Sequence, residues 1–145
     1  MGFKRKARIL FLSRFDACRS PMAEAFTNSL GSQWLEARSA GVGIHPLDEK
    51  AISVMKEKGI DISKSSSQLL DKELLQWADL LVVMDEIAGV RIGRLPKHVQ
   101  RRDYFFDHLG AGNSLEDYRL LRDRILMRVK AIEGGMRMLA KVKER

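Results

Sequence analysis

The sequence predicts an α/β domain with a mostly parallel sheet, and three observations indicate this fold class. Apolar runs of strand length alternate with amphipathic stretches of helix length along the chain. The run DLLVVM at 79–84 is apolar and bounded by charge, which is typical of a strand covered on both faces. No repeat, low-complexity linker or composition break interrupts residues 1–145, so we expect a single domain.

Four stretches are expected to form strands. Ala7–Leu12 is a short apolar run, and Trp34–Ala40 is closed by glycines. Asp79–Met84 is the clearest strand, and Arg102–Phe106 is a weaker fourth. Because helices separate the strands, right-handed crossovers between parallel strands are expected.

The helices are predicted from their caps and their apolar spacing. Ser20 is expected to be the N-cap of the first helix and Pro21 its first residue, with a stop at Gly31. The next three helices are expected at 48–58, 69–77 and 85–95.

The last helix is predicted to start at Ser114, with Asp117 as its capping partner, and to bend or fray at Gly134-Gly135. Its apolar positions recur every three or four residues and form one stripe. They are Leu115, Tyr118, Leu121, Ile125, Val129, Ile132, Met136 and Leu139.

Composition is typical of a soluble protein in a reducing compartment. No run approaches the roughly 18 apolar residues of a membrane helix, and the basic start has no signal-peptide core. We therefore expect a cytoplasmic protein without a membrane partner. Cys18 is the only cysteine, which excludes an internal disulfide and a cysteine-based metal site, and no metal or cofactor is implied.

The net charge favours anionic partners. Lys and Arg number 26 and Asp and Glu 19, which gives +7 and raises encounter rates with anions. A nucleic-acid partner is not expected, because no aromatic-interleaved basic motif or zinc finger is present. The oligomeric state is left open.

The turn between the first strand and the first helix is the expected ligand site. Parallel sheets bind ligands at the carboxyl ends of their strands. Free N–H groups and the helix dipole at this point suit a phosphate-like anion, and Arg19 can hold two of its oxygens. The candidate oxyanion-binding residues are Ser13, Arg14, Phe15, Asp16, Ala17, Cys18, Arg19 and Ser20.

The segment Ile9–Glu24 resembles the signature V-C-x-G-N-x-C-R-S-P-x-A-E of the low-molecular-weight protein tyrosine phosphatases and of the thioredoxin-coupled arsenate reductases that share their fold. Ser39-Ala40-Gly41 matches the family's S-A-G, residues 51–63 look like the arsenate reductase branch, and 79–84 and 116–123 also match. The resemblance implies a three-layer, phosphotyrosine phosphatase I-like fold with a four-stranded parallel sheet of order 2-1-3-4 and helices on both faces.

The resemblance places Ser13 at the position of the family's nucleophilic cysteine, six residues before Arg19. A hydroxyl is a weaker acid than a thiol by several pKa units, each about 1.4 kcal/mol. A serine nucleophile therefore needs a base, and the candidates are Asp16, His45 and His108. The family pattern also implies a hydrogen bond from Ser20 to residue 13.

Other loop positions depart from the family as well. Phe15 replaces its Gly and Asp16 its Asn, which favours natural divergence over an engineered single substitution. An ionised Asp16 pointing inward would repel an anion. Cys18 matches the second cysteine of the signature but has no arginine six residues later, so we expect a buried, unreactive side chain.

The remaining family residues are also altered. Asp107 is the candidate general acid, with His108 in place of the family's Pro, and a one-residue shift would make His108 the acid. The arsenate reductases need two further cysteines near the positions of Met84 and Arg91, and their absence excludes a thiol–disulfide relay.

Three functions follow as hypotheses. The leading one is a phosphatase-like protein that binds phosphate-type oxyanions or a phosphorylated partner with little or no hydrolysis. The second is an active phosphomonoesterase that uses Ser13 and Arg19 with Asp107 or His108 as acid. The third is a non-catalytic interaction module whose basic surface binds an acidic protein or nucleic acid.

Overall fold

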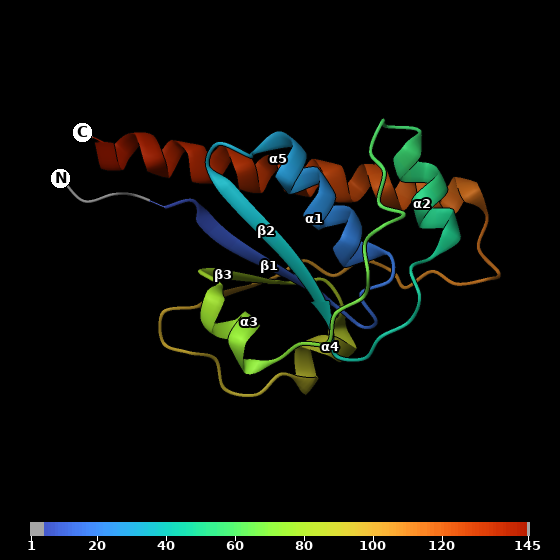
Figure 1. Cartoon of the computed structure of the whole chain (residues 1–145), viewed down its shortest axis with the longest axis horizontal. Helices are drawn as coiled ribbons and strands as arrows, with labels where there is room; N and C mark the ends of the chain where they lie inside the picture. Colours follow the sequence, from blue (N-terminus) through green and yellow to red (C-terminus); the bar gives the residue numbers. More distant parts are fainter. Residues whose placement is uncertain (1–4, 145) are drawn as a thin grey trace.

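A computed structural model describes residues 5–144, with side chains up to residue 137. Four parallel strands form one sheet in the order β2-β1-β3-β4, which confirms the predicted topology (Figure 1). The strands are β1 (Ala7–Ser13), β2 (Leu35–Gly41), β3 (Leu80–Val83) and β4 (Gln100–Asp103).

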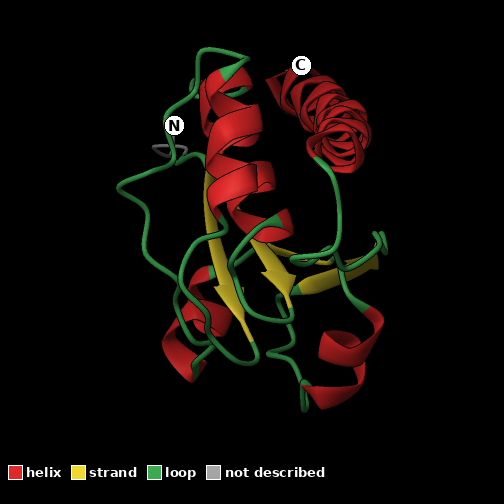
Figure 2. Cartoon of the chain, turned by 90° about the vertical axis from the view of Figure 1, so that its right-hand side faces the viewer, coloured by secondary structure: helices red, strands yellow, loops and turns green. Residues whose placement is uncertain are grey.

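Within residues 5–144, five helices cover the two faces of the sheet. On one face lie α1 (Arg19–Leu30), α2 (Glu49–Lys56) and α5 (Leu115–Glu144). On the other lie α3 (Lys72–Trp77) and α4 (Glu86–Arg91), so the sheet is the middle of three layers (Figure 2).

The central strand β1 explains the long apolar run at its position. Side chains alternate between the faces of a strand, and Ile9 and Phe11 join the core under α1 and α5. Leu10 and Leu12 join the second core, under α3 and α4. Because β1 is covered on both faces, its sequence shows no alternation of apolar and polar residues.

The long helix α5 confirms most of the predicted stripe. Tyr118, Leu121, Ile125 and Val129 are buried, whereas Leu115 is 40% exposed, so the stripe was wrong at its first position. Leu115 is the first residue of the helix. The side chain of Leu139 is outside the described residues.

The ends of α5 were predicted with mixed success. The capping pair is confirmed, because Asp117 N–H donates to Ser114 Oγ (3.2 Å) and Ser114 N–H to Asp117 Oδ2 (3.0 Å). The helix continues through Gly134-Gly135, where a bend or fraying was expected.

The predicted cap of α1 is wrong. The helix begins at Arg19, and Cys18 occupies the N-cap position without a side-chain capping bond. Ser20 lies inside the helix, and its hydroxyl bonds to loop side chains. Pro21 is therefore the third helical residue, where its missing N–H is still not needed by the helix.

The other predicted boundaries shift because side chains cap the helices. Asp48, Asp71 and Asp85 each accept a backbone N–H as N-cap residues, so α2, α3 and α4 start one residue later. Because Asp71 caps α3, this helix starts three residues after the predicted 69. At its other end α4 stops at Arg91, four residues before the predicted 95. The fourth strand spans 100–103 rather than 102–106, because its pairing with β3 ends at Val83↔Asp103.

None of the helices in the part of the chain that the structure describes is long and apolar enough to cross a membrane.

We expect Ile125→Ala to lower the free energy of unfolding by about 2–5 kcal/mol, because it opens a cavity under α5. Ile125 is 0% exposed, and Met127 on the same helix is 72% exposed. Urea unfolding should therefore show a much smaller change for the control Met127→Ala. Equal losses in the two variants would contradict the placement of α5.

Candidate functional site

The loop 14–18 joins β1 to α1 at the carboxyl ends of the parallel strands (Figure 1). Its backbone lies directly on Gly41 at the end of β2. A Cβ atom at Gly41 would stand 2.8 Å from the Asp16 nitrogen and 2.3 Å from the Gly43 oxygen. The loop therefore requires glycine at 41, which accounts for the S-A-G match.

The peptide groups of this loop share one orientation. The carbonyls of residues 13–18 all accept hydrogen bonds from groups outside the loop or from the helix. The donors, in order, are Val42 N (3.3 Å), Gly43 N (2.8 Å), His45 N (3.3 Å), Ser67 Oγ (2.7 Å), Asp48 N (2.9 Å) and Met22 N (3.1 Å). In a planar trans peptide, the N–H points in the direction opposite to the C=O of the same peptide group. Each N–H of the loop therefore points away from the donor that this C=O binds.

The N–H groups of residues 14–19 consequently line the inner side of the loop. Within the described part of the chain, they donate to no acceptor. Successive unpaired amides at a helix start form a concave site for an anion. Anion binding by this loop stays a prediction that this arrangement of amides favours.

Asp16 holds the loop from within. Its backbone φ of 52° is left-handed, as expected for a residue at the family's Asn position. Its Oδ1 accepts from Ser20 Oγ at 2.7 Å and its Oδ2 from Gln68 N at 2.9 Å. The side chain is 1% exposed, and burial raises its pKa although these bonds oppose the shift.

Ser13 lies at the end of β1 and is 2% exposed. Its Oγ is 2.5 Å from Ser20 Oγ, as the family pattern implied. Ser13, Ser20 and Asp16 thus form one continuous chain of hydrogen bonds.

Arg19 is buried and fixed by acceptors from two other strand ends. Its Nη1 donates to Asp85 Oδ1 (2.8 Å), to the Phe106 carbonyl (2.8 Å) and to the Met84 carbonyl (3.3 Å). Arg14 also donates to Asp85, at 3.1 and 3.3 Å. The two guanidinium groups are therefore held together by one carboxylate.

Sequence reasoning missed Asp85. Burial opposes its ionisation, but the Ala88 N–H and the two arginines lower its pKa to about 2, so it is a carboxylate. The signal was present in the sequence, because an Asp directly follows the third strand and precedes a helix. Its pairing with Arg19 could not be predicted, since the two residues are 66 positions apart.

The rim of the site is aromatic. The Phe15 ring lies 4.3 Å from His45 and 5.8 Å from His108 between ring centroids. His108 Nδ1 is 3.3 Å from Arg19 Nη2, and burial together with Arg19 lowers the pKa of this histidine. Asp107, the other candidate acid, is exposed on the same loop.

Cys18 is half-buried and packs against the main core. Burial, with Asp48 nearby, raises the pKa of its thiol to about 12. The thiol is therefore protonated at neutral pH and is a poor nucleophile. The described residues contain no cluster of three His, Cys, Asp or Glu side chains that could hold a metal ion.

Glu24 carries a second perturbed carboxyl group near the loop. Burial raises the pKa of Glu24 to about 7. The hydrogen bond that Ser39 Oγ donates to Glu24 at 3.1 Å acts in the opposite direction and lowers this pKa. The nearby Asp16 adds to the shift. The carboxyl is therefore partly protonated at neutral pH.

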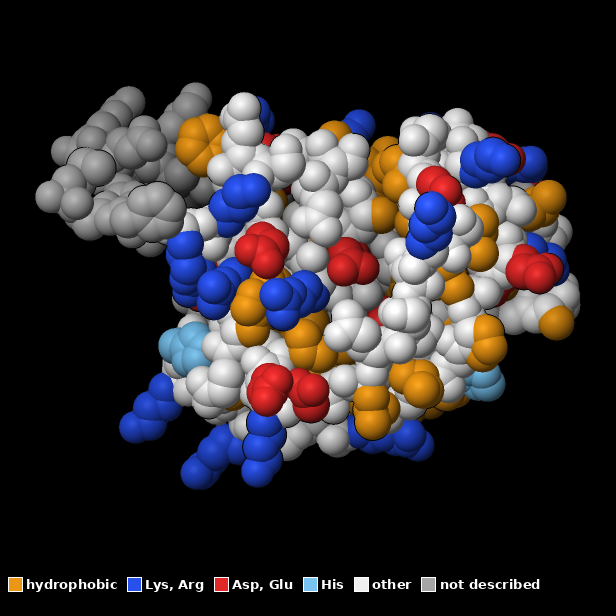
Figure 3. All heavy atoms as spheres, in the orientation of Figure 1, with side chains coloured by type: hydrophobic (Ala, Val, Ile, Leu, Met, Phe, Trp, Pro, Cys, Tyr) orange, Lys and Arg blue, Asp and Glu red, His pale blue; other side chains and the backbone are white. Residues whose placement is uncertain are grey.

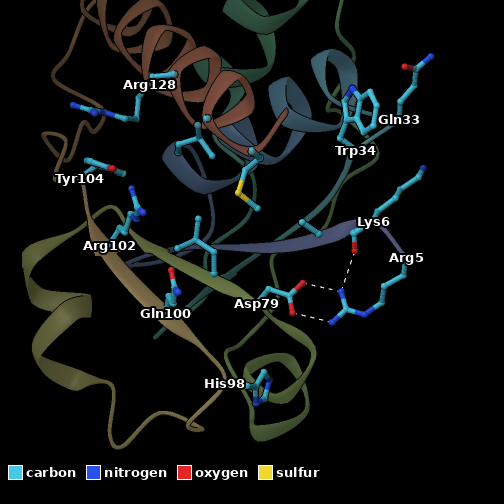
Figure 4. A pocket seen from close by; sticks show the side chains of 16 residues that line it. Arg5, Lys6, Gln33, Trp34, Asp79, His98, Gln100, Arg102, Tyr104 and Arg128 are labelled. Atoms are coloured by element: carbon cyan, nitrogen blue, oxygen red, sulfur yellow. Dashed lines mark hydrogen bonds and ion pairs between the residues drawn. The ribbon is translucent and has the colours of Figure 1, made fainter. Parts of the chain in front are cut away.

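A separate groove of about 1190 Å³ lies at the opposite end of the strands, under α5. Figure 4 shows Arg5 paired with Asp79 on one side and Arg128 beside Tyr104 on the other. Lys and Arg side chains also gather near this end of the molecule in Figure 3. The cations that line the groove are Arg5, Lys6, Arg102 and Arg128.

Comparison with known proteins gives the class. Residues 8–134 match the family described as low molecular weight phosphotyrosine protein phosphatase, and the chain belongs to this family. An arsenate reductase of Brevibacillus brevis is 38% identical over 128 residues, covering 88% of this chain and 94% of the relative.

Two solved structures are similar over the whole fold. The YwlE arginine phosphatase of Geobacillus stearothermophilus has a TM-score of 0.81 at 25% identity and covers 96% of this chain and 97% of its own. A cysteine-to-serine mutant of a YwlE arginine phosphatase, described as having a phosphorylated active-site serine, has a TM-score of 0.76 at 26% identity. That match covers 90% of this chain and 95% of the mutant.

We expect Glu24→Gln to stabilise the protein at pH 8. A carboxyl whose pKa rises from 4.5 to about 7 on folding contributes stability below pH 4.5 that is lost as the pH rises through 7. Urea midpoints should show the variant about 1–3 kcal/mol more stable at pH 8, with the gain vanishing near pH 4. Glu36→Gln on β2, where the side chain is 46% exposed, is the matched control. A gain for Glu24→Gln that is independent of pH would refute the assignment.

Proposed function

We propose that this chain binds phosphate-type oxyanions, as phosphate esters of a protein partner or a small molecule, and hydrolyses them slowly or not at all. The supporting observation is the set of amides at residues 14–19 that donate to no acceptor in the described part of the chain, in the loop that follows Ser13. An anion gains charge-assisted hydrogen bonds from these groups.

Slow hydrolysis follows from the chemistry of Ser13. A serine alkoxide is a worse leaving group than a thiolate. The phosphoryl group of a phosphoserine formed at this position is therefore transferred to water slowly. The YwlE mutant supports this proposal, because the serine that replaces its cysteine is described as phosphorylated.

The arsenate reductase names of the relatives suggest a bound oxyanion rather than reduction by this chain. Reduction through a thiol–disulfide relay needs several thiols, and the sequence contains Cys18 alone. A reducing, cytoplasmic setting is part of the proposal for the same reason.

A second candidate function rests on the basic groove under α5. Its four cations and one acidic side chain, Asp79, favour an acidic protein as partner. Such binding would depend on salt and would not involve the loop.

We expect phosphate, arsenate and vanadate to raise the melting temperature of the wild-type protein, because a ligand at 100 times its Kd adds about 2.7 kcal/mol of stability. The ligand-induced shift should disappear in Arg19→Ala and persist in Arg91→Ala, whose arginine is exposed at the end of α4. Binding of anionic partners that survives Arg19→Ala would instead favour the groove.

We expect Ser13→Cys to increase p-nitrophenyl phosphate turnover at least about tenfold, because the pKa of a thiol is several units below that of a hydroxyl. The steady-state release of p-nitrophenol measures this change. Ser66→Cys adds a thiol at an exposed position and should change nothing. Turnover by wild type that equals turnover by Ser13→Cys would contradict the slow-hydrolysis proposal.

A further inference from the structure

The buried hydrogen-bond chain from Ser13 to Asp16 has a defined direction. Asp16 Oδ2 accepts from the Gln68 N–H, and in its ionised form the carboxylate can only accept. Ser20 must therefore donate its single hydroxyl proton to Oδ1 of Asp16, at 2.7 Å. The 2.5 Å contact between the serines is then a bond that Ser13 donates to Ser20.

This direction supplies the base that a serine nucleophile needs. A proton that leaves Ser13 can pass to Ser20 while the proton of Ser20 passes to Asp16. Burial raises the pKa of Asp16, which strengthens it as a proton acceptor. The family's Asn at this position would accept the same hydrogen bond but could not take up the proton.

We propose that Asp16, acting through Ser20, makes Ser13 a covalent phosphoryl acceptor. Ser13 Oγ forms a bond to phosphorus as the bond from phosphorus to the ester oxygen breaks. The electron pair of the broken bond leaves on that oxygen. The proton of Ser13 moves to Ser20, and the proton of Ser20 moves to Asp16.

The inference also explains why two departures from the family occur together. Ser13 replaces a nucleophile that ionises without a base, and Asp16 places a base two hydrogen bonds away. The carboxylate points at Ser20 and Gln68 rather than at the anion, which reduces the repulsion expected from the sequence. The three side chains are at most 2% exposed, so water does not compete for the protons.

This inference rests on the proposed function, because phosphoryl transfer needs the ester bound in the loop. The test incubates the full chain with p-nitrophenyl phosphate and follows the intact mass and the site of modification. Wild type should gain one phosphoryl group on Ser13, with a matching burst of p-nitrophenol. Vanadate binding, measured by thermal shift in each variant, reports the oxyanion site separately.

The decisive comparison is Asp16→Asn on two backgrounds. With Ser13 present, the variant should be phosphorylated at least about 100-fold more slowly, because the proton acceptor is gone. On the Ser13→Cys background the same change should cost at least about tenfold less, because a thiolate forms without a base. The exposed Asp61→Asn is the matched control and should leave both rates unchanged.

The outcomes separate the two proposals. Equal losses on both backgrounds would mean that Asp16 only shapes the loop, and the relay would be overturned. A wild-type protein that binds vanadate but gains no phosphoryl group would overturn the relay and leave oxyanion binding intact. Failure to bind vanadate would overturn both. Ser20→Ala removes the hydroxyl that links Ser13 to Asp16. If Asp16→Asn does not fold, this variant takes its place in the comparison, and an unchanged rate of Ser13 phosphorylation would overturn the relay.

Discussion

The site depends on the outward hydrogen bonding of the peptide carbonyls of residues 13–18. Each carbonyl is fixed by a donor from the segment after β2, from Ser67 or from α1 itself. This external framework determines where the amides point, and it leaves the charge and size of the loop side chains free to vary. The loop can therefore keep its backbone geometry although Phe15 and Asp16 differ from the family pattern.

Gly41 is the most restrictive residue of that framework. The loop backbone approaches it so closely that any side chain would overlap backbone atoms, which cannot move as a flexible side chain can. The adjacent Gly41–Leu69 bridge joins the segment that carries Ser67 and Gln68 to the same strand end. The glycine thus connects β2 both to the loop backbone at Asp16 and to the segment whose Ser67 and Gln68 bond to Asp16.

Arg19 illustrates how the fold holds a buried cation in place. Burying a guanidinium without partners is costly, and Asp85 with two carbonyls offsets that cost. The ion pair also fixes the position of the guanidinium, so little side-chain entropy remains to be lost on binding. This chain has the buried ion pair together with a serine at position 13.

The amino-acid sequence alone was enough to predict the parallel α/β fold, the loop 13–20 and the unusual residues within it. Those features are local: apolar runs, a glycine and a proline at fixed points, and a strand followed directly by a helix. Only the tertiary structure placed Asp85 on Arg19 and His108 beside it, since these contacts join distant strand ends. It also corrected Ser20 from a helix cap to a link between Ser13 and Asp16, because a left-handed residue at 16 turns the carboxylate back toward the helix.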